Sequence, residues 1–212
     1  MKPKVAYFTE RGWPVKGIIH VGASDGEEVD GYHQLGIQNI ICFEPLRSAY
    51  EVFQKKHSEV LCLPFGLSNK SGKRTLNVSA GDGKGTSALK VILDHPEVKE
   101  KWNHGQAEVV GKQQAKFVRF DEWADQRPGI DWRQFNCVVV DAQGMSLEVL
   151  EGFGDYLKNV NYLVVELSET PVYKGEAPAE EVADWLDDQG FVQLTPTFPH
   201  DDVLFRRAEI TI

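Results

Sequence analysis

The segment from Ile18 to Glu28, IIHVGASDGEE, indicates the fold class of this chain. Its first four residues form a short apolar run that ends at Gly22, and a helix is predicted from Glu27 to Leu35. A glycine-containing turn between a strand and a helix lets a ligand approach the backbone and the N-terminus of the helix. In open α/β sheets such a turn lies beyond the carboxyl ends of the strands, where ligands bind. The segment therefore predicts a strand, a turn and a helix at a ligand-binding edge.

Strands and helices continue to alternate on both sides of a less regular middle part. The predicted strands are Asn39–Phe43, Val60–Leu63, Cys137–Val140, Tyr162–Leu167, Phe191–Thr195 and Asp202–Arg206, and the predicted helices are Leu46–Lys56, Met145–Glu151 and Pro178–Gln189. Apolar strands in this order are typical of a parallel sheet covered by helices on both faces. Because no helix separates the last two strands, we expect them to form an antiparallel hairpin at the edge of the sheet.

Residues 69–120 interrupt this alternation. Strands are predicted there at Arg74–Ser79 and Lys116–Phe120, with several glycines around the first and a polar stretch before the second. The segment has too few apolar residues for a core of its own, so we interpret it as a β-containing insertion. A length of 212 residues fits one domain, and we predict a single domain over residues 1–212.

The charge of the chain restricts its partners. Lys and Arg total 23 against 32 Asp and Glu, a formal net charge of −9, which argues against nucleic acid and anionic membranes as partners. No apolar run approaches the roughly 20 residues of a membrane span, and the N-terminus lacks the apolar region of a signal peptide. The three cysteines lie in apolar runs, so we expect reduced core thiols in a cytoplasmic protein.

An acidic residue follows the second predicted strand. Phe43-Glu44-Pro45 places a carboxylate about 20 residues after Gly22, where α/β nucleotide-binding folds have an acid that binds ribose hydroxyls. An acid at the end of a strand can also serve only to cap the next helix, and the glycine can serve only the turn. Together, the turn and Glu44 predict a ligand that contains ribose.

The composition of the turn favours S-adenosylmethionine over a dinucleotide. The GxGxxG pattern would need glycine at two positions that are occupied here by Ser24 and Glu27. The carboxylates of Asp25, Glu27 and Glu28 would repel a pyrophosphate at the helix N-terminus. S-adenosylmethionine has no phosphate and carries a sulfonium cation and an amine, which an acidic turn tolerates better. An NAD-dependent enzyme is therefore the less favoured alternative.

Two more carboxylates are predicted at the same edge of the sheet. Asp141 follows the strand Cys137–Val140, and Glu166 lies at the end of the next strand. Parallel strands end at a common edge, so both should lie near Gly22 and Glu44. A carboxylate there can hold a substrate or accept its proton, and Asp141 is the first candidate for a general base, with Glu166 the second. Alternatively, Asp141 only caps the helix that follows.

Other classes of site have weaker support. Gly22 to Gly26 also fits the GxSxG pattern of α/β-hydrolases, with Asp141 and His200 downstream, but residues 1–17 lack an oxyanion-hole loop. The six histidines show no close-paired metal-ligand spacing, so no metal site is predicted. His20 lies in an apolar strand and is more typical of a core residue than of a base.

The order of short motifs along residues 17–207 resembles the FkbM family of S-adenosylmethionine-dependent methyltransferases. The motifs are HVGASDGEE, FEP, GLSNKSG, GTSAL, RFDEW, VVVDAQGMSLEVLEGFG, VVELSE, VYKGEAP and DDVLFRR. No single motif is decisive, but their order and spacing are specific. The resemblance implies a class I methyltransferase with a Rossmann-like α/β fold and S-adenosylmethionine as cofactor. The implied sheet is seven-stranded and mostly parallel, with an antiparallel last strand.

The resemblance also assigns residues to the cofactor site. The loop would comprise Gly22, Ala23, Ser24, Asp25 and Gly26 after His20; Glu44 and Pro45 would lie at the ribose, Phe65, Gly66 and Leu67 at the adenine, and Asp141, Gln143, Gly144 and Glu166 at the reaction end. His20 stands where many members have Asp, which weakens one cofactor contact. Ser146 stands where many have Glu, which implies altered specificity or low activity if that Glu orients substrate or catalyses.

The expected function is methylation of a hydroxyl oxygen on a sugar or a small natural-product-like acceptor. The acceptor would be a small molecule or a glycan, and residues 69–115 are expected to shape its pocket. Two alternatives belong to other classes. One is a methyltransferase-fold binding protein without turnover, motivated by Ser146, and the other is an NAD-dependent enzyme. The sequence indicates neither the identity of the acceptor nor the oligomeric state.

Overall fold

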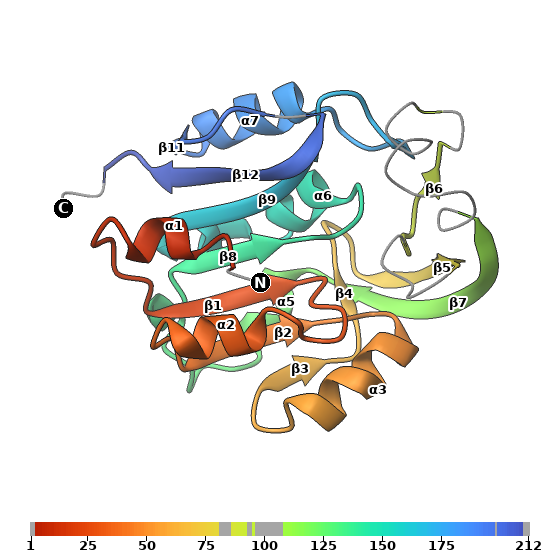
Figure 1. The fold of residues 1–212 in the computed structure, drawn as a ribbon, viewed down its shortest axis with the longest axis horizontal. Coiled ribbons are helices and arrows are strands. Elements are labelled where there is room, and N and C mark those ends of the chain that lie inside the picture. Colours follow the sequence, from red (N-terminus) through yellow and green to blue (C-terminus); the bar gives the residue numbers. More distant parts are fainter. Residues whose placement is uncertain (1–2, 81–85, 93–94, 96–107, 198, 210–212) are drawn as a thin grey trace.

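The main sheet of the computed structural model has seven strands, and the structure describes residues 3–80, 86–92, 95, 108–197 and 199–209 (Figure 1). The strands are β1 (Gly17–Val21), β2 (Asn39–Phe43), β3 (Leu61–Leu63), β8 (Cys137–Val140), β9 (Tyr162–Ser168), β11 (Phe191–Gln193) and β12 (His200–Arg207). They lie in the order β11-β12-β9-β8-β1-β2-β3. β12 runs antiparallel to β9 and β11, and the other pairings in this sheet are parallel, which confirms the predicted fold.

Helices cover both faces of the sheet because its strands are apolar on both sides. One face packs against α1 (Ala6–Thr9), α2 (Val29–Gln34) and α3 (Arg47–Lys56), and the other against α5 (Phe120–Asp125), α6 (Ser146–Glu151) and α7 (Ala179–Asp188). Two 3₁₀ helices, η1 (Trp132–Gln134) and η2 (Gly154–Asn159), lie in the connections that flank β8 and α6. Within the described residues, no helix has the length and apolar character to cross a membrane.

Adjacent residues of β1 belong to different cores. Ile18 packs in the core under α1, α2 and α3, whereas Ile19 and Val21 pack in the core under α5, α6 and α7. The three cysteines, at positions 42, 62 and 137, are all buried, as predicted. The alternation of side chains also decides which residues near the end of β1 can reach a ligand.

The insertion forms a small sheet beyond the carboxyl ends of the main strands (Figure 1). β5 (Gly72–Ser79) pairs antiparallel with β7 (Val109–Val118), and β4 (Gly66–Leu67) pairs parallel with β7. A second pair, β6 (Lys90–Val91) with β10 (Tyr173–Lys174), joins the insertion to the segment after β9. The glycine-rich and polar stretches considered above lie partly in residues 81–85, 93–94 and 96–107, outside the described residues.

The strand predicted at Lys116–Phe120 has different limits in the structure. β7 begins at Val109, and its first six residues are exposed or half-exposed, so they carry no alternating apolar pattern that would reveal a strand. Phe120 was wrongly assigned to the strand, because it begins α5 and its ring stacks on Phe153 at 4.3 Å between centroids. Tertiary packing therefore determines both ends of this element.

Candidate active site

A cavity of about 500 Å³ lies at the carboxyl edge of the main sheet. Its polar wall includes four carboxylates, Glu27, Glu44, Asp141 and Glu166. Its apolar wall comes from α3 and its N-cap, from the loop after β8, and from the small sheet, which contributes side chains such as Leu76 and Phe117. Thus the sheet edge supplies most of the charge and the insertion supplies much of the apolar surface.

The loop between β1 and α2 is held tightly against two neighbouring strand ends. The N–H of Gly22 donates to the carbonyl of Phe43 at 2.9 Å, and the N–H of Asp141 donates to the carbonyl of Val21 at 2.9 Å. Gly22 has φ +84°, and a Cβ atom there would lie 1.8 Å from the carbonyl oxygen of Asp141. Glycine is therefore required at position 22 both by backbone conformation and by space.

Glu44 joins this loop to the start of α3. The N–H of Ser24 donates to Glu44 Oε2 at 2.8 Å, and the N–H of Leu46 donates to Oε1 at 2.6 Å. The side chain is buried, which raises the pKa of Glu44 to about 7 even though the two N–H groups oppose the shift. Leu46 is the N-cap residue of α3, so the capping role considered for this acid is present. The carboxylate also lines the cavity, where its remaining lone pairs can accept further hydrogen bonds.

Several other residues assigned to the cofactor site also line the cavity. They are Gly22, Ser24, Pro45, Gly66, Leu67, Asp141, Gln143 and Glu166. Ser24 has φ +48°, a left-handed backbone that turns the chain between β1 and α2. Direct contact of these residues with a cofactor stays a prediction.

His20 lies away from the cavity lining. Its ring is buried with Nδ1 3.1 Å from the hydroxyl of Tyr32, and Glu28 lies 3.6 Å from Nε2. Burial lowers the pKa of His20, and the charge of Glu28 opposes that shift less strongly. The strand alternation places His20 on the face of α2, which supports its interpretation as a core residue, and its contact with a cofactor stays a prediction.

Five further residues of the assigned set, Gly144 among them, also lie outside the lining. Ala23 is packed in the core. Asp25 forms an ion pair with Lys56 on α3. The ring of Phe65 packs against the ring of Phe43, with 5.6 Å between the ring centroids. A Cβ atom at Gly26 would collide with the side chains of two residues near the end of α3, Phe53 and His57. These residues shape the walls of the site without forming its surface.

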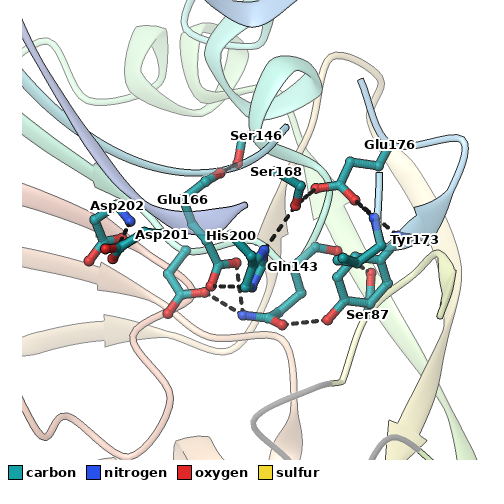
Figure 2. A network of polar contacts seen from close by, with 12 residues as sticks. Ser87, Gln143, Ser146, Glu166, Ser168, Tyr173, Glu176, His200, Asp201 and Asp202 are labelled. Carbon is teal, nitrogen blue, oxygen red and sulfur yellow. Dashed lines mark hydrogen bonds and ion pairs between the residues drawn. The ribbon is translucent and has the colours of Figure 1, made fainter. Parts of the chain in front are cut away.

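Gln143 links the two candidate catalytic carboxylates, and Figure 2 shows its contact with Glu166. Its Nε2 donates to Asp141 Oδ1 at 2.6 Å and to Glu166 Oε2 at 3.1 Å, and its Oε1 accepts a hydrogen bond from the hydroxyl of Tyr173 at 2.5 Å. Burial, and then the negative charge of Glu166, raise the pKa of Asp141 well above its usual range. A carboxylate with a raised pKa is a stronger base, which is the property a proton acceptor needs.

A family model described as the methyltransferase FkbM domain matches residues 20–192. The chain belongs to the FkbM methyltransferase family. Its strand order and its antiparallel β12 are those of the class I methyltransferase fold. No curated protein matches this chain.

Solved methyltransferase structures resemble this FkbM protein at low identity. A Streptococcus pneumoniae protein described as a tRNA methyltransferase, in complex with S-adenosyl-L-methionine, has 10% identity over 92% of this chain and 67% of that one, with a TM-score of 0.47. Magnesium protoporphyrin IX methyltransferase from Synechocystis, with bound cofactor, has 12% identity over 96% and 76%, with a TM-score of 0.44. An rRNA methylase from Streptococcus thermophilus has 9% identity over 91% and 87%, with a TM-score of 0.46.

Ser146 is part of the framework of this methyltransferase. It is buried and its hydroxyl donates to the carbonyl of Glu166 at 2.9 Å, which ties α6 to β9. It does not line the cavity. The Ser146 side chain therefore contacts the backbone of Glu166 and not the cavity.

The sequence did not indicate His200 as a site residue of this FkbM protein. It was considered only as the histidine that could follow the GxSxG pattern in a hydrolase. It lines the cavity, and its Nε2 lies 3.2 Å from Glu166 Oε1. Because β12 is antiparallel, its first residue lies at the edge where the parallel strands end, opposite Ser168 of β9. The predicted hairpin already implied that the last strand is antiparallel, but that strand was predicted to begin only at Asp202, so His200 lay outside it.

Within the parts of the chain that the structure describes, no group of three or more His, Cys, Asp or Glu side chains could hold a metal ion.

Proposed function

We propose that this FkbM methyltransferase transfers a methyl group from S-adenosylmethionine to a hydroxyl oxygen of a sugar or of a small natural-product-like acceptor. The observation that carries the proposal is the row of carboxylates at the ends of β2, β8 and β9, with Glu44 next to the glycine loop. When bound, S-adenosylmethionine supplies a methyl group activated by the adjacent sulfonium.

The lining of the cavity fits this cofactor. Glu44 has acceptor capacity left for ribose hydroxyls, and the apolar residues Leu46, Ala49 and Leu67 can cover a flat base. The negative charge of Glu27 and Asp141 suits a cationic ligand. The same charge disfavours the pyrophosphate of NAD.

The chain's own residues would hold and deprotonate the acceptor. Asp141 and Glu166 line the cavity side by side, so either can accept the hydrogen bond of an acceptor hydroxyl and orient its oxygen. The raised pKa of Asp141 makes it the first candidate for the general base, with Glu166 the second.

We propose a small polyhydroxylated molecule or a glycan as the acceptor, and a cytoplasmic location. The net charge of −9 disfavours a nucleic acid, and the cavity wall combines carboxylates with Thr86, Ser87 and Gln143, which suit uncharged hydroxyls. The three buried free thiols, of which Cys42 and Cys137 are fully covered, suit a reducing compartment.

Calorimetry and product mass test this proposal. S-adenosylhomocysteine should bind more tightly than NAD, and incubation with S-adenosylmethionine and a panel of sugars and hydroxylated natural products should yield a product heavier by one methylene group. Tight binding of NAD with no response to S-adenosylhomocysteine would refute the cofactor assignment. Binding of S-adenosylhomocysteine without any methylated product would favour the alternative of a binding protein without turnover.

A further inference from the structure

Behind the cavity, three polar side chains form a line that starts at His200 (Figure 2). His200 Nδ1 lies 2.9 Å from the hydroxyl oxygen of Ser168, and that hydroxyl donates to Glu176 Oε1 at 2.8 Å. Ser168 has no exposed surface and Glu176 is 9% exposed. The line therefore runs from the cavity wall into the interior of the protein.

The direction of the hydrogen bonds along this line follows from the carboxylate. Glu176 Oε2 accepts the N–H groups of Val172 and Tyr173 at 2.7 and 2.9 Å, and Oε1 accepts the hydroxyl proton of Ser168. A carboxylate can only accept, and a serine hydroxyl has one proton to donate. Ser168 is therefore an acceptor toward His200, whose Nδ1 must carry a hydrogen.

This direction selects the tautomer of His200. In a neutral imidazole one nitrogen carries a hydrogen and the other a lone pair, and the hydrogen bond of one nitrogen decides the state of the other. With the hydrogen on Nδ1, Nε2 carries the lone pair of the neutral ring, and its 3.2 Å contact with Glu166 Oε1 is a hydrogen bond when one proton lies between the two atoms. Both His200 and Glu166 line the cavity.

We propose that His200 Nε2 is the final acceptor of the proton that the acceptor hydroxyl loses, received through Glu166, and that Ser168 and Glu176 are positioning residues that fix its tautomer. This inference rests on the proposed function. The acceptor oxygen forms its bond to the methyl carbon, and the carbon–sulfur bond breaks with its electron pair staying on sulfur. The proton passes to the general base, Asp141, and from there through Glu166, to which Asp141 is hydrogen-bonded, to Nε2. An imidazole has an unperturbed pKa of about 6.5, closer to neutral pH than that of a carboxylate, so it holds a proton better at that pH.

The first test is kinetic. In His200→Asn the amide can replace Nδ1–H as the donor to Ser168, but the basic Nε2 is absent. We expect kcat to fall by at least ~10², with KM and the affinity for S-adenosylhomocysteine within threefold of wild type. His33→Asn, on the partly exposed side of α2, is the matched control and should leave kcat within twofold.

The second test changes Glu176, which fixes the tautomer of His200 through Ser168 and does not line the cavity. In Glu176→Gln the side-chain amide can donate to Ser168, so the hydroxyl turns to donate to Nδ1 and the hydrogen of His200 moves to Nε2. ¹⁵N NMR of the imidazole should show Nδ1–H in wild type and Nε2–H in the variant, with kcat lowered at least tenfold. Glu180→Gln, at an exposed position in the first turn of α7, is the control. Should Glu176→Gln fail to fold, Ser168→Ala, which removes the link, replaces it and should lower kcat likewise.

The outcomes separate the two proposals. An active wild-type enzyme with an equally active His200→Asn variant would overturn the role of His200 alone, as would an Nε2–H tautomer in wild type. A wild-type protein that methylates none of the panel would refute the proposed function, and the role of His200 with it.

Discussion

Glu44 is the residue whose protonation depends most directly on a bound ligand. Burial holds its pKa at about 7, and ribose hydroxyls that donate to it would favour the charged form. Near pH 7 about half of the Glu44 side chains are protonated, so we predict that binding of S-adenosylhomocysteine at this pH releases up to about half a proton. Calorimetry in two buffers of different ionisation enthalpy measures this number directly.

The Glu44→Gln variant is the counterpart of that measurement. It should bind S-adenosylhomocysteine about 10- to 150-fold more weakly, which corresponds to ~1.5–3 kcal/mol for a charge-assisted hydrogen bond. It should also release no proton, whereas Glu27→Gln, in the same turn, should still release it. Proton uptake by wild type, or an unchanged affinity in Glu44→Gln, would place the ribose elsewhere.

Asp141 combines a position in the cavity with a raised pKa, and a variant separates its chemical role from its structural one. Asp141→Asn keeps an oxygen to accept the hydrogen bond of Gln143 but loses the charge. We predict that turnover falls by at least ~10² and that cofactor affinity stays within about tenfold. Wild-type kcat should rise with pH as Asp141 loses its proton, and the variant should lack this rise. Asn caps helices about as well as Asp. If Asp141 only caps the helix that follows it, Asp141→Asn should have nearly the turnover and melting temperature of wild type.

At the residue scale, the sequence predicts best those positions that follow directly from a strand end. Glu44, Asp141 and Glu166 lie at one edge because parallel strands end together, and all three line the cavity as expected. For His20 the family pattern indicates that the residue is near the ligand but not toward which face its side chain points, and its role toward the cofactor stays a prediction. His200 was missed because its contact depends on the register of β12 with β9, which no local pattern encodes.

At the scale of elements, the β1–α2 turn is constrained by its contact with the end of β8. Gly22 and Gly36 have nearly equal φ, +84° and +80°, but only the first has an atom within 4 Å of a built Cβ. Gly36→Ala should therefore cost only the left-handed backbone term, about 1–2 kcal/mol. We predict that Gly22→Ala costs at least ~2 kcal/mol more, because its Cβ must displace the backbone of Asp141.

Urea denaturation of the two variants, with ligand affinity measured on the folded protein, checks this prediction. Equal midpoints for Gly22→Ala and Gly36→Ala would show that the loop relaxes away from β8 at little cost.

Element boundaries were predictable where a helix or strand is marked by its own residues. α7 starts after Pro178 and ends before Gly190, as its composition predicts. β7 was not predictable in its first half, because Val109 to Gln114 are held by pairing with β5 and not by burial of an alternating face. A polar strand of this kind is specified by its partner.

At the scale of the whole molecule, the buried acids make stability depend on pH in an unusual direction. Burial raises the pKa of Glu44 to about 7 and that of Asp202 to about 6, above the values of 4.5 and 3.8 expected when unfolded. A folded state with raised carboxyl pKa values binds more protons than the unfolded chain, so these groups make stability fall as the pH rises from about 4 to 7. For Glu44 the effect is on the order of 3 kcal/mol, at about 1.4 kcal/mol per pKa unit.

We therefore predict that the urea midpoint of the ligand-free protein decreases between pH 5 and pH 8 more steeply in wild type than in Glu44→Gln. Groups that titrate equally in both proteins contribute equally to the two pH dependences, so the difference between the curves reports on Glu44. Saturating S-adenosylhomocysteine should reduce the difference, because the ligand stabilises the charged form of Glu44. Parallel curves for the two proteins would contradict the prediction.

The overall architecture was predictable because alternating apolar strands and amphipathic helices repeat along most of the chain, and the FkbM motifs then define the strand order. The interpretation of residues 69–120 as an insertion, and not as a domain of its own, rests on their few apolar residues and stays a prediction, whereas nothing in the sequence indicates the pairing with the segment after β9 through β6 and β10. The single-domain organisation over residues 1–212 stays a prediction.

The reversed direction of β12 offers a practical way to observe ligand arrival. Its first residue lies beside the cavity opposite Ser168, whereas Arg206 pairs with Tyr162 at the far edge of the sheet. A fluorophore attached to a cysteine introduced at Thr197 would sit on the ligand side, and one attached at Ala208 would sit on the opposite side. In the two labelled proteins the dyes would lie near opposite ends of β12. The fluorescence of the dye far from the cavity would therefore serve as the reference for the fluorescence of the dye near it.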